Sequence, residues 1–175
     1  MNCHGKRCVI TGAPCSGKST VIRGLESLGY FVVHEAARNY IDTQLRMGRT
    51  MEDIRGNALA FQQALLYQKQ KNEENLPEKE LIFLDRGIPD SIAYYRLYRL
   101  PADEALALSR RYFYHKIFFF RMLPFANDRA RNEDEQTARK LARLIYEAYR
   151  MLDYEIIPVP LMPVRERIAY VLNHL

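Results

Sequence analysis

The chain has 175 residues and lacks most features that would divide it or carry it into a membrane. It contains no tract rich in glycine, serine or proline that would mark a linker, and no internal repeat. It also has no apolar run of about 18 residues, the length that a membrane-spanning helix requires, and no segment with the pattern of a secretory signal. We therefore expect one domain over residues 1–175, large enough for an ordinary core and located in the cytoplasm.

Cysteine is scarce, and its placement does not suit a disulfide framework. Cys3, Cys8 and Cys15 all lie within the first fifteen residues, and an odd number so close together favours reduced thiols. Cys3, His4 and Cys8 lack the paired spacing of a zinc site. We expect no metal there.

Long runs of one charge are also absent. Basic residues outnumber acidic ones by 26 to 21, which gives a net charge of +5, yet no five or six basic residues follow one another. No mixed aromatic and basic motif of the RNA-recognition kind is found either. Nucleic acid is therefore not an expected partner, and an enzyme that handles phosphate needs the same positive charge.

The sequence does contain a glycine-rich segment that fits GxxxxGK[ST] at every specified position. Such a loop wraps backbone N–H groups around the β-phosphate of a nucleotide, while its lysine reaches the β- and γ-phosphates and its serine hydroxyl faces Mg²⁺. An apolar run precedes it and a segment of helical periodicity follows. We expect the nucleotide to be bound by Gly12, Ala13, Pro14, Cys15, Ser16, Gly17, Lys18, Ser19 and Thr20.

Cys15 lies inside this loop and differs from the other two cysteines. Amide donors and Lys18 would surround it, and such a setting lowers the pKa of a thiol. We expect oxidation or alkylation of Cys15 to interfere with nucleotide binding.

Short apolar runs alternate with helical periodicity along the whole chain, which predicts an α/β fold with a parallel sheet and helices on both faces. The expected strands are 7–11, 30–34, 81–84, 117–120 and 155–159. The expected helices cover 17–28, 35–48, 50–74, 89–98 and 102–112, with one through 141–148 and a last one from about 164. Thr50 and Asp53 resemble a capping box that opens the long third helix.

Ligands of such sheets bind at the carboxyl ends of the strands, where Thr11, Glu35, Asp85 and Arg121 are predicted to lie. Asp85 suits a carboxylate that holds Mg²⁺ beside Ser19, directly or through water, or alternatively a helix N-cap. Arg86 suits phosphate binding, or alternatively a surface pair with Asp90.

Glu35 and Arg38 are one helical turn apart and would share a face if the helix begins at Glu35. Glu35 could then accept the proton of an attacking hydroxyl while Arg38 neutralises an anionic group of an acceptor. The alternative is a solvated pair in the first helical turn.

Arginines gather in the segment of about 121–133 between the fourth strand and the next helix. Arg121, Arg129 and Arg131 could close over a triphosphate as a lid, because charge builds on the transferred phosphoryl group. The alternative is a solvated basic loop. Tyr146 and Tyr149 on the next helix are expected to pack rather than to stack on a base.

Several segments together resemble a family of small AAA-type ATPase domains and, in part, the kinase domain of NadR-type ribosylnicotinamide kinases. They read GAPCSGKST, HEAAR, FLDRGIPD, PFANDRARNED and EIIPVP. The resemblance implies a three-layer P-loop nucleoside and nucleotide kinase fold with sheet order 2-3-1-4-5, and ATP with Mg²⁺. By the same resemblance Asp85 and Arg86 match the acid–arginine pair of nucleoside and thymidylate kinases, and Arg129 and Arg131 match lid arginines.

Two functions are compatible with these patterns. The first is a kinase that transfers the γ-phosphate of Mg-ATP to a small-molecule acceptor, with Lys18, Asp85, Glu35, Arg129 and Arg131 as catalytic residues. Glu35, Arg38 and Arg86 would then bind the acceptor. The second is a nucleotide-dependent switch or regulatory ATPase that acts through a protein partner. We favour ATP over GTP, since no guanine-reading NKxD motif is present, while the acceptor and the oligomeric state stay open.

Overall fold

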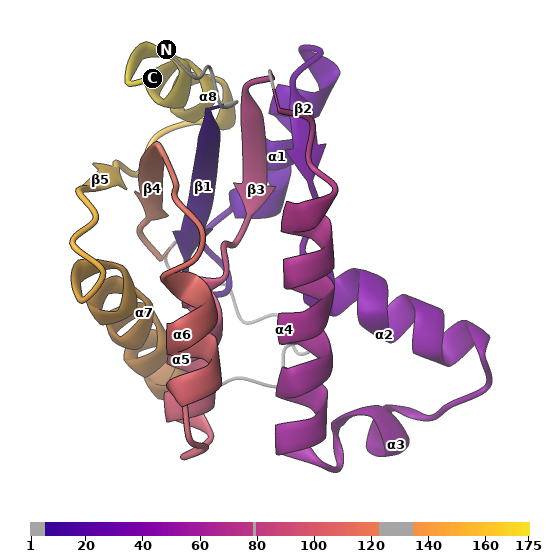
Figure 1. The fold of residues 1–175 in the computed structure, drawn as a ribbon. Coiled ribbons are helices and arrows are strands. Elements are labelled where there is room, and N and C mark those ends of the chain that lie inside the picture. The colour runs from indigo at the N-terminus through magenta and orange to yellow at the C-terminus, as the bar shows by residue number, and fades with distance from the viewer. Residues whose placement is uncertain (1–5, 79, 123–134) are drawn as a thin grey trace.

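The computed structural model describes residues 6–78, 80–122 and 135–175. Its centre is a five-stranded sheet in which all strands run parallel, in the order β2-β3-β1-β4-β5 (Figure 1). The strands are β1 (Arg7–Gly12), β2 (Phe31–Val33), β3 (Ile82–Asp85), β4 (Lys116–Phe120) and β5 (Ile156–Val159). The expected strands, their direction and the order 2-3-1-4-5 are confirmed.

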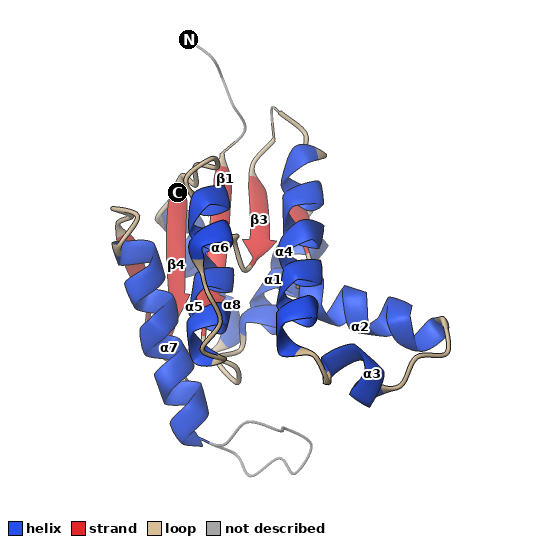
Figure 2. Cartoon of the chain, turned by 60° about the horizontal axis from the view of Figure 1, so that its bottom comes forward, coloured by secondary structure: helices blue, strands red, loops and turns tan. Residues whose placement is uncertain are grey.

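Helices cover both faces of this sheet and make the fold three-layered (Figures 1 and 2). They are α1 (Lys18–Ser27), α2 (Ala36–Arg46), α3 (Met51–Arg55), α4 (Ala58–Glu74), α5 (Pro89–Leu97), α6 (Asp103–Ser109), α7 (Glu135–Arg150) and α8 (Val164–Asn173). On one face α1 packs with α8, and on the other α5 packs with α7.

Side chains of β1 alternate between these two layers. Cys8 and Ile10 contribute to the core beneath α1 and α8, whereas Val9 belongs to the core beneath α5 and α7. All three are fully buried. A strand buried on both faces has no polar side to expose, and this explains why its sequence reads as a continuous apolar run.

The single long helix expected from residue 50 to 74 is wrong, because the chain forms two helices there. The capping box of Thr50 and Asp53 is present, but it opens only the short α3. Gly56 follows α3, and the side chain of Asn57 then accepts a hydrogen bond from the N–H of Ala60 and begins α4. Glycine weakens a helix and asparagine is a strong N-cap, so this pair favours a break over continuation.

The break has a consequence for the shape of the molecule. Helices α2 and α3 project to one side of the sheet and contact α4 near its N-terminal end (Figures 1 and 2). In the described ranges, no helix has both the length and the apolarity needed to cross a membrane.

Two glycines have positive φ but differ in the space around them. Gly12 ends β1 with φ +129°, and a Cβ there would collide with the carbonyl oxygen of Phe120 in β4. Gly29, with φ +90°, follows α1 and has open space around it. We expect Gly29→Ala to cost about 1 kcal/mol from backbone strain alone. Gly12→Ala should cost at least about 2 kcal/mol more, because β1 and β4 must separate.

Urea unfolding of the two variants beside the wild type measures this difference. Equal losses in the free energy of unfolding would show that the approach of Gly12 to β4 is looser than described.

Candidate functional site

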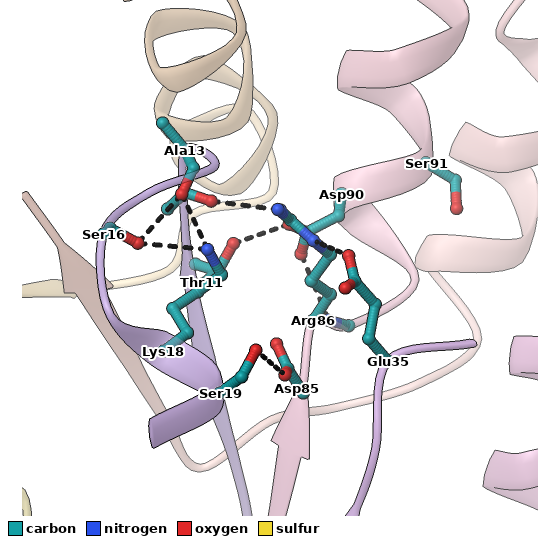
Figure 3. A network of polar contacts seen from close by, with 12 residues as sticks. Thr11, Ala13, Ser16, Lys18, Ser19, Glu35, Asp85, Arg86, Asp90 and Ser91 are labelled. Atoms are coloured by element: carbon teal, nitrogen blue, oxygen red, sulfur yellow. Dashed lines mark hydrogen bonds and ion pairs between the residues drawn. The ribbon is translucent and has the colours of Figure 1, made fainter. Parts of the chain in front are cut away.

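The glycine-rich loop between β1 and α1 closes around the side chain of Lys18. Its Nζ donates hydrogen bonds to the carbonyl oxygen of Ala13 at 2.7 Å and to Oγ of Ser16 at 3.0 Å (Figure 3). Oγ of Ser16 in turn donates to the same carbonyl at 2.8 Å. Gly17, with φ +81°, turns the chain into α1 and leaves the first N–H groups of that helix without a side-chain cap. The loop therefore offers free backbone donors and a cation at one helix N-terminus, which is the arrangement that binds phosphate.

Lys18 is buried, and its charge has no carboxylate directly bonded to it in the described part of the chain. Burial and the nearby Arg86 lower the pKa of Lys18 to about 8, although Asp85 and Glu35 act in the opposite direction. An arriving phosphate would supply negative charge and raise this pKa toward its ordinary value.

Ser19 and Asp85 form the part of the site that could hold a metal ion. Oγ of Ser19 lies 3.4 Å from Oδ2 of Asp85 (Figure 3). The other oxygen, Oδ1, is buried and has no hydrogen-bond partner among the described residues. A hydroxyl beside a carboxylate with an unused buried oxygen fits Mg²⁺, which prefers oxygen ligands and keeps several waters.

The environment of Asp85 also bears on its alternative role as a helix cap. Burial raises the pKa of its carboxyl, although Lys18 acts in the opposite direction. The N-cap of α5 is Ile88, and no side chain caps this helix.

Among the described residues, no group of three His, Cys, Asp or Glu side chains could enclose a metal. Phosphate oxygens and water would therefore complete the coordination of Mg²⁺ here.

Glu35 stands at the carboxyl end of β2 and is the N-cap of α2. Its Oε1 accepts a hydrogen bond from Nε of Arg86 at 2.8 Å. Burial acts to raise the pKa of Glu35, but the charge of Arg86 and its hydrogen bond outweigh this and hold the pKa below its ordinary value. Arg38 is exposed and lines the same cavity as Glu35, whose ion-pair partner is Arg86.

Arg86 is buried and bonded on several sides. Besides Glu35, it donates from Nη1 to the carbonyl of Gly12 and to Oδ1 of Asp90, both at 3.0 Å (Figure 3). The pairing with Asp90 is therefore present, but it lies in the interior rather than on the surface. Arg86 also has φ +72°, an unusual backbone conformation for a residue with a side chain.

Asp90 is fully buried and accepts bonds from three further donors. Thr11 donates its hydroxyl at 2.6 Å, Tyr149 its hydroxyl at 2.6 Å and Gly87 its backbone N–H at 3.1 Å. The packing role expected for Tyr149 is correct, but its hydroxyl additionally completes this network. These donors, together with Arg86, satisfy both oxygens of the buried carboxylate.

A cavity of about 630 Å³ connects these groups. The phosphate loop from Pro14 to Thr20 lines it, whereas Gly12 and Ala13 are buried beneath the surface. Glu35, Arg38 and Arg86 line it as well. Helices α3, α4 and α5 contribute further side chains to the lining, among them Arg55, Phe61, Gln62, Leu65, Lys69 and Tyr94.

Of the three arginines expected in a lid, the structure describes Arg121. Arg121 follows β4 and lines a separate, smaller hollow with Phe119 and Tyr146. Arg129 and Arg131 lie outside the described residues.

Two residues at the site were not predicted from the sequence. Arg167 of α8 donates from Nη1 to the carbonyl of Ser16 at 3.1 Å and so supports the phosphate loop from the rear. Lys69 of α4 donates to the carbonyl of Gly87 at 2.9 Å and to Oγ of Ser91 at 3.0 Å. Neither residue belongs to a local motif, and only the tertiary fold brings each one to the site.

Comparison with known proteins identifies both a family and a fold. The model of the AAA domain family matches residues 7–167. The structure is similar to NadR protein in complex with NR, with a TM-score of 0.70 and 15% identity over 97% of this chain and 50% of that one. It is also similar to deoxyadenosine kinase from M. mycoides, with a TM-score of 0.64 and 16% identity over 96% and 97% of the two chains.

Thymidylate kinase from Ehrlichia chaffeensis gives a TM-score of 0.69 with 12% identity over 98% of each chain. At such identities the similarity establishes the P-loop nucleoside and nucleotide kinase fold. The chain spans about half the length of the NadR structure. No curated protein sequence matches the chain.

Replacing Lys18 by Ala should weaken ATP binding at least about 10-fold, because a charged hydrogen-bond donor to phosphate is lost. In the wild type, ATP affinity should fall as the pH rises through about 8, where Lys18 loses its proton. Titration calorimetry from pH 7 to pH 9 measures both effects. The exposed Lys71→Ala is the control, and unchanged affinity in Lys18→Ala would contradict the assignment of the loop.

Replacing Asp90 by Ala should lower the free energy of unfolding by about 3–5 kcal/mol, since Arg86 then loses a buried counter-charge. Tyr149→Phe removes one hydrogen bond from the same carboxylate and should cost about 1 kcal/mol. Urea unfolding distinguishes the two. A loss in Asp90→Ala no larger than in Tyr149→Phe would contradict the central role of this carboxylate.

Proposed function

This chain belongs to the AAA domain family, and from that premise we propose that it is a kinase that transfers the γ-phosphate of Mg-ATP to a hydroxyl of a small molecule. The observation that carries the proposal is the single cavity that extends from the phosphate loop past Glu35 to the wall formed by α4 and α5. A nucleotide switch needs the loop, but it does not need an enclosed space for a second small molecule beside it.

The loop residues bind and orient the donor. The backbone N–H groups at the start of α1 and the ammonium of Lys18 would hold the β- and γ-phosphates, and they neutralise charge as it develops on the transferred group. Ser19 and Asp85 would hold Mg²⁺, which supplies further neutralisation when bound. Arg129 and Arg131 remain the candidates for lid residues that exclude water.

Glu35 is the candidate general base. It lines the cavity, and the lowered pKa keeps its carboxylate ionised and able to accept a proton near neutral pH. The acceptor hydroxyl would give its proton to Glu35 as its oxygen bonds to the γ-phosphorus and the bond to ADP breaks. Arg86 fixes the direction of the carboxylate through the bond from Nε.

Proteins with this fold provide further support. The similar structures include kinases named for deoxyadenosine, thymidylate and shikimate. Their acceptors differ widely, so the fold supports the reaction class without identifying the acceptor.

Phosphate accounting tests the proposal. The protein is incubated with ATP and Mg²⁺ and with a panel of nucleosides, nucleotides and vitamins, and both ADP and the phosphorylated product are measured. A kinase gives acceptor-stimulated ADP formation with the phosphate on the acceptor. Slow hydrolysis that no acceptor stimulates would contradict the proposal and favour a regulatory ATPase.

Once an acceptor is known, Glu35→Gln should reduce transfer by about 100-fold or more with little change in ATP affinity, as the loss of a general base would. Glu52→Gln on the exposed side of α3 serves as the matched control. Transfer rates under saturating ATP measure the effect. Undiminished transfer in Glu35→Gln would remove this residue from the mechanism.

A further inference from the structure

Two lysines line the cavity, and their ammonium groups bond uncharged oxygens among the described residues. Lys18 bonds the carbonyl of Ala13 and the hydroxyl of Ser16. Lys69 bonds the carbonyl of Gly87 and the hydroxyl of Ser91. In the described ranges, neither lysine takes part in an ion pair. Both side chains belong to the cavity lining, but they come from different walls.

The carboxylates near Lys69 are engaged by other donors. Asp90 accepts four hydrogen bonds, none of which comes from Lys69. Glu35 accepts from Arg86. Glu73, one turn further along α4, accepts from Arg7 at 2.8 Å and from the hydroxyl of Tyr114 at 2.7 Å.

The carboxylates near Lys69 compensate its charge only in part. Burial and the charge of Arg86 lower the pKa of Lys69 to about 8, although Asp90, Glu35 and Glu73 act to raise it. A partly buried ammonium without a directly bonded anion carries a desolvation penalty. An ammonium also has three N–H donors, of which the two bonds to Gly87 and Ser91 use two. A ligand oxygen in the cavity could take the third.

Lys69 belongs to α4 and thus lines the cavity from a different element than the phosphate loop does. Gln62, Leu65 and Lys69 follow one another on α4 at spacings of three and four residues, so they share one face of the helix, and all three line the cavity. Arg38 of α2 and Arg55 of α3 line it as well. Outside the loop and α1, the basic lining residues Arg38, Arg55, Lys69 and Arg86 outnumber the acidic ones, Glu35 and Asp42.

We propose that Lys69 binds an oxyanion of the acceptor, so that the substrate carries a phosphate or a carboxylate in addition to the hydroxyl that is phosphorylated. Lys18 then binds the phosphates of the nucleotide, and Lys69 binds the anionic group of the acceptor in the same cavity. This inference rests on the proposed kinase function. It narrows the acceptors from nucleosides and other neutral alcohols to anionic compounds such as nucleoside monophosphates or hydroxycarboxylates.

The test distinguishes the anion site at Lys69 from the phosphate loop by keeping the loop occupied. AMP-PNP and Mg²⁺ are kept saturating, so that the phosphate loop is occupied, and inorganic phosphate or acetate is then titrated at constant ionic strength. Thermal unfolding reports binding, because a ligand of the folded state raises Tm. We expect a saturable rise with phosphate, acetate or both, and the active anion indicates which acceptor class to screen.

Variants of α4 assign that response to Lys69. Lys69→Gln keeps a donor for Gly87 and Ser91 but removes the charge, and should weaken the apparent Kd of the anion at least about 10-fold. Lys69→Arg should retain binding. Lys71→Gln, an exposed position on the same helix, is the matched control. Affinity for AMP-PNP should stay at the wild-type value in all three variants.

The outcomes separate this inference from the proposed function. No saturable response in the wild type, or an equal response in Lys69→Gln, would overturn the inference. Transfer to neutral acceptors at equal rates in the wild type and Lys69→Gln would also overturn it, while the kinase function would stand. Anion binding that depends on Lys69, without transfer to any acceptor of the matching class, would leave the site intact and count against the kinase function.

Discussion

The buried carboxylate of Asp90 is the interaction on which the geometry of the site depends. A charge in the interior must be surrounded by donors, and those of Asp90 come from β1, from the loop after β3 and from α7. The carboxylate therefore fixes the end of β1, the turn after β3 and the facing helix relative to one another. The phosphate loop begins at Gly12, directly after Thr11, so its starting position is set by the same group.

Arg86 links this arrangement to Glu35. Its backbone has positive φ, a conformation that costs energy and persists where surrounding contacts hold it. Asp90 and the carbonyl of Gly12 hold one end of the guanidinium, and Nε then meets Glu35. The candidate base is thus tied through one side chain to the strand that carries the phosphate loop. Arg86, which the sequence suggests as a phosphate ligand, donates hydrogen bonds to Gly12, Asp90 and Glu35.

Local patterns predict the sheet and the position of the glycine-rich loop. Apolar runs mark the strands, and the loop motif marks the turn that closes around Lys18. The helix assumed to begin at Glu35 begins instead at Ala36, so Glu35 is an N-cap with non-helical backbone and helical spacing does not relate it to Arg38. The partners of Asp90 are as many as 79 residues away in the chain, and Lys69 looks like any lysine of an amphipathic helix. Such contacts exist only after the layers have assembled.

The bond from Arg167 to the carbonyl of Ser16 spans 151 residues. During synthesis the phosphate loop is therefore made long before the guanidinium that supports it. The central strand β1 likewise precedes β3 and β4, its neighbours in the sheet. The loop gains its support from the rear only after α8 has been made and has packed beside α1.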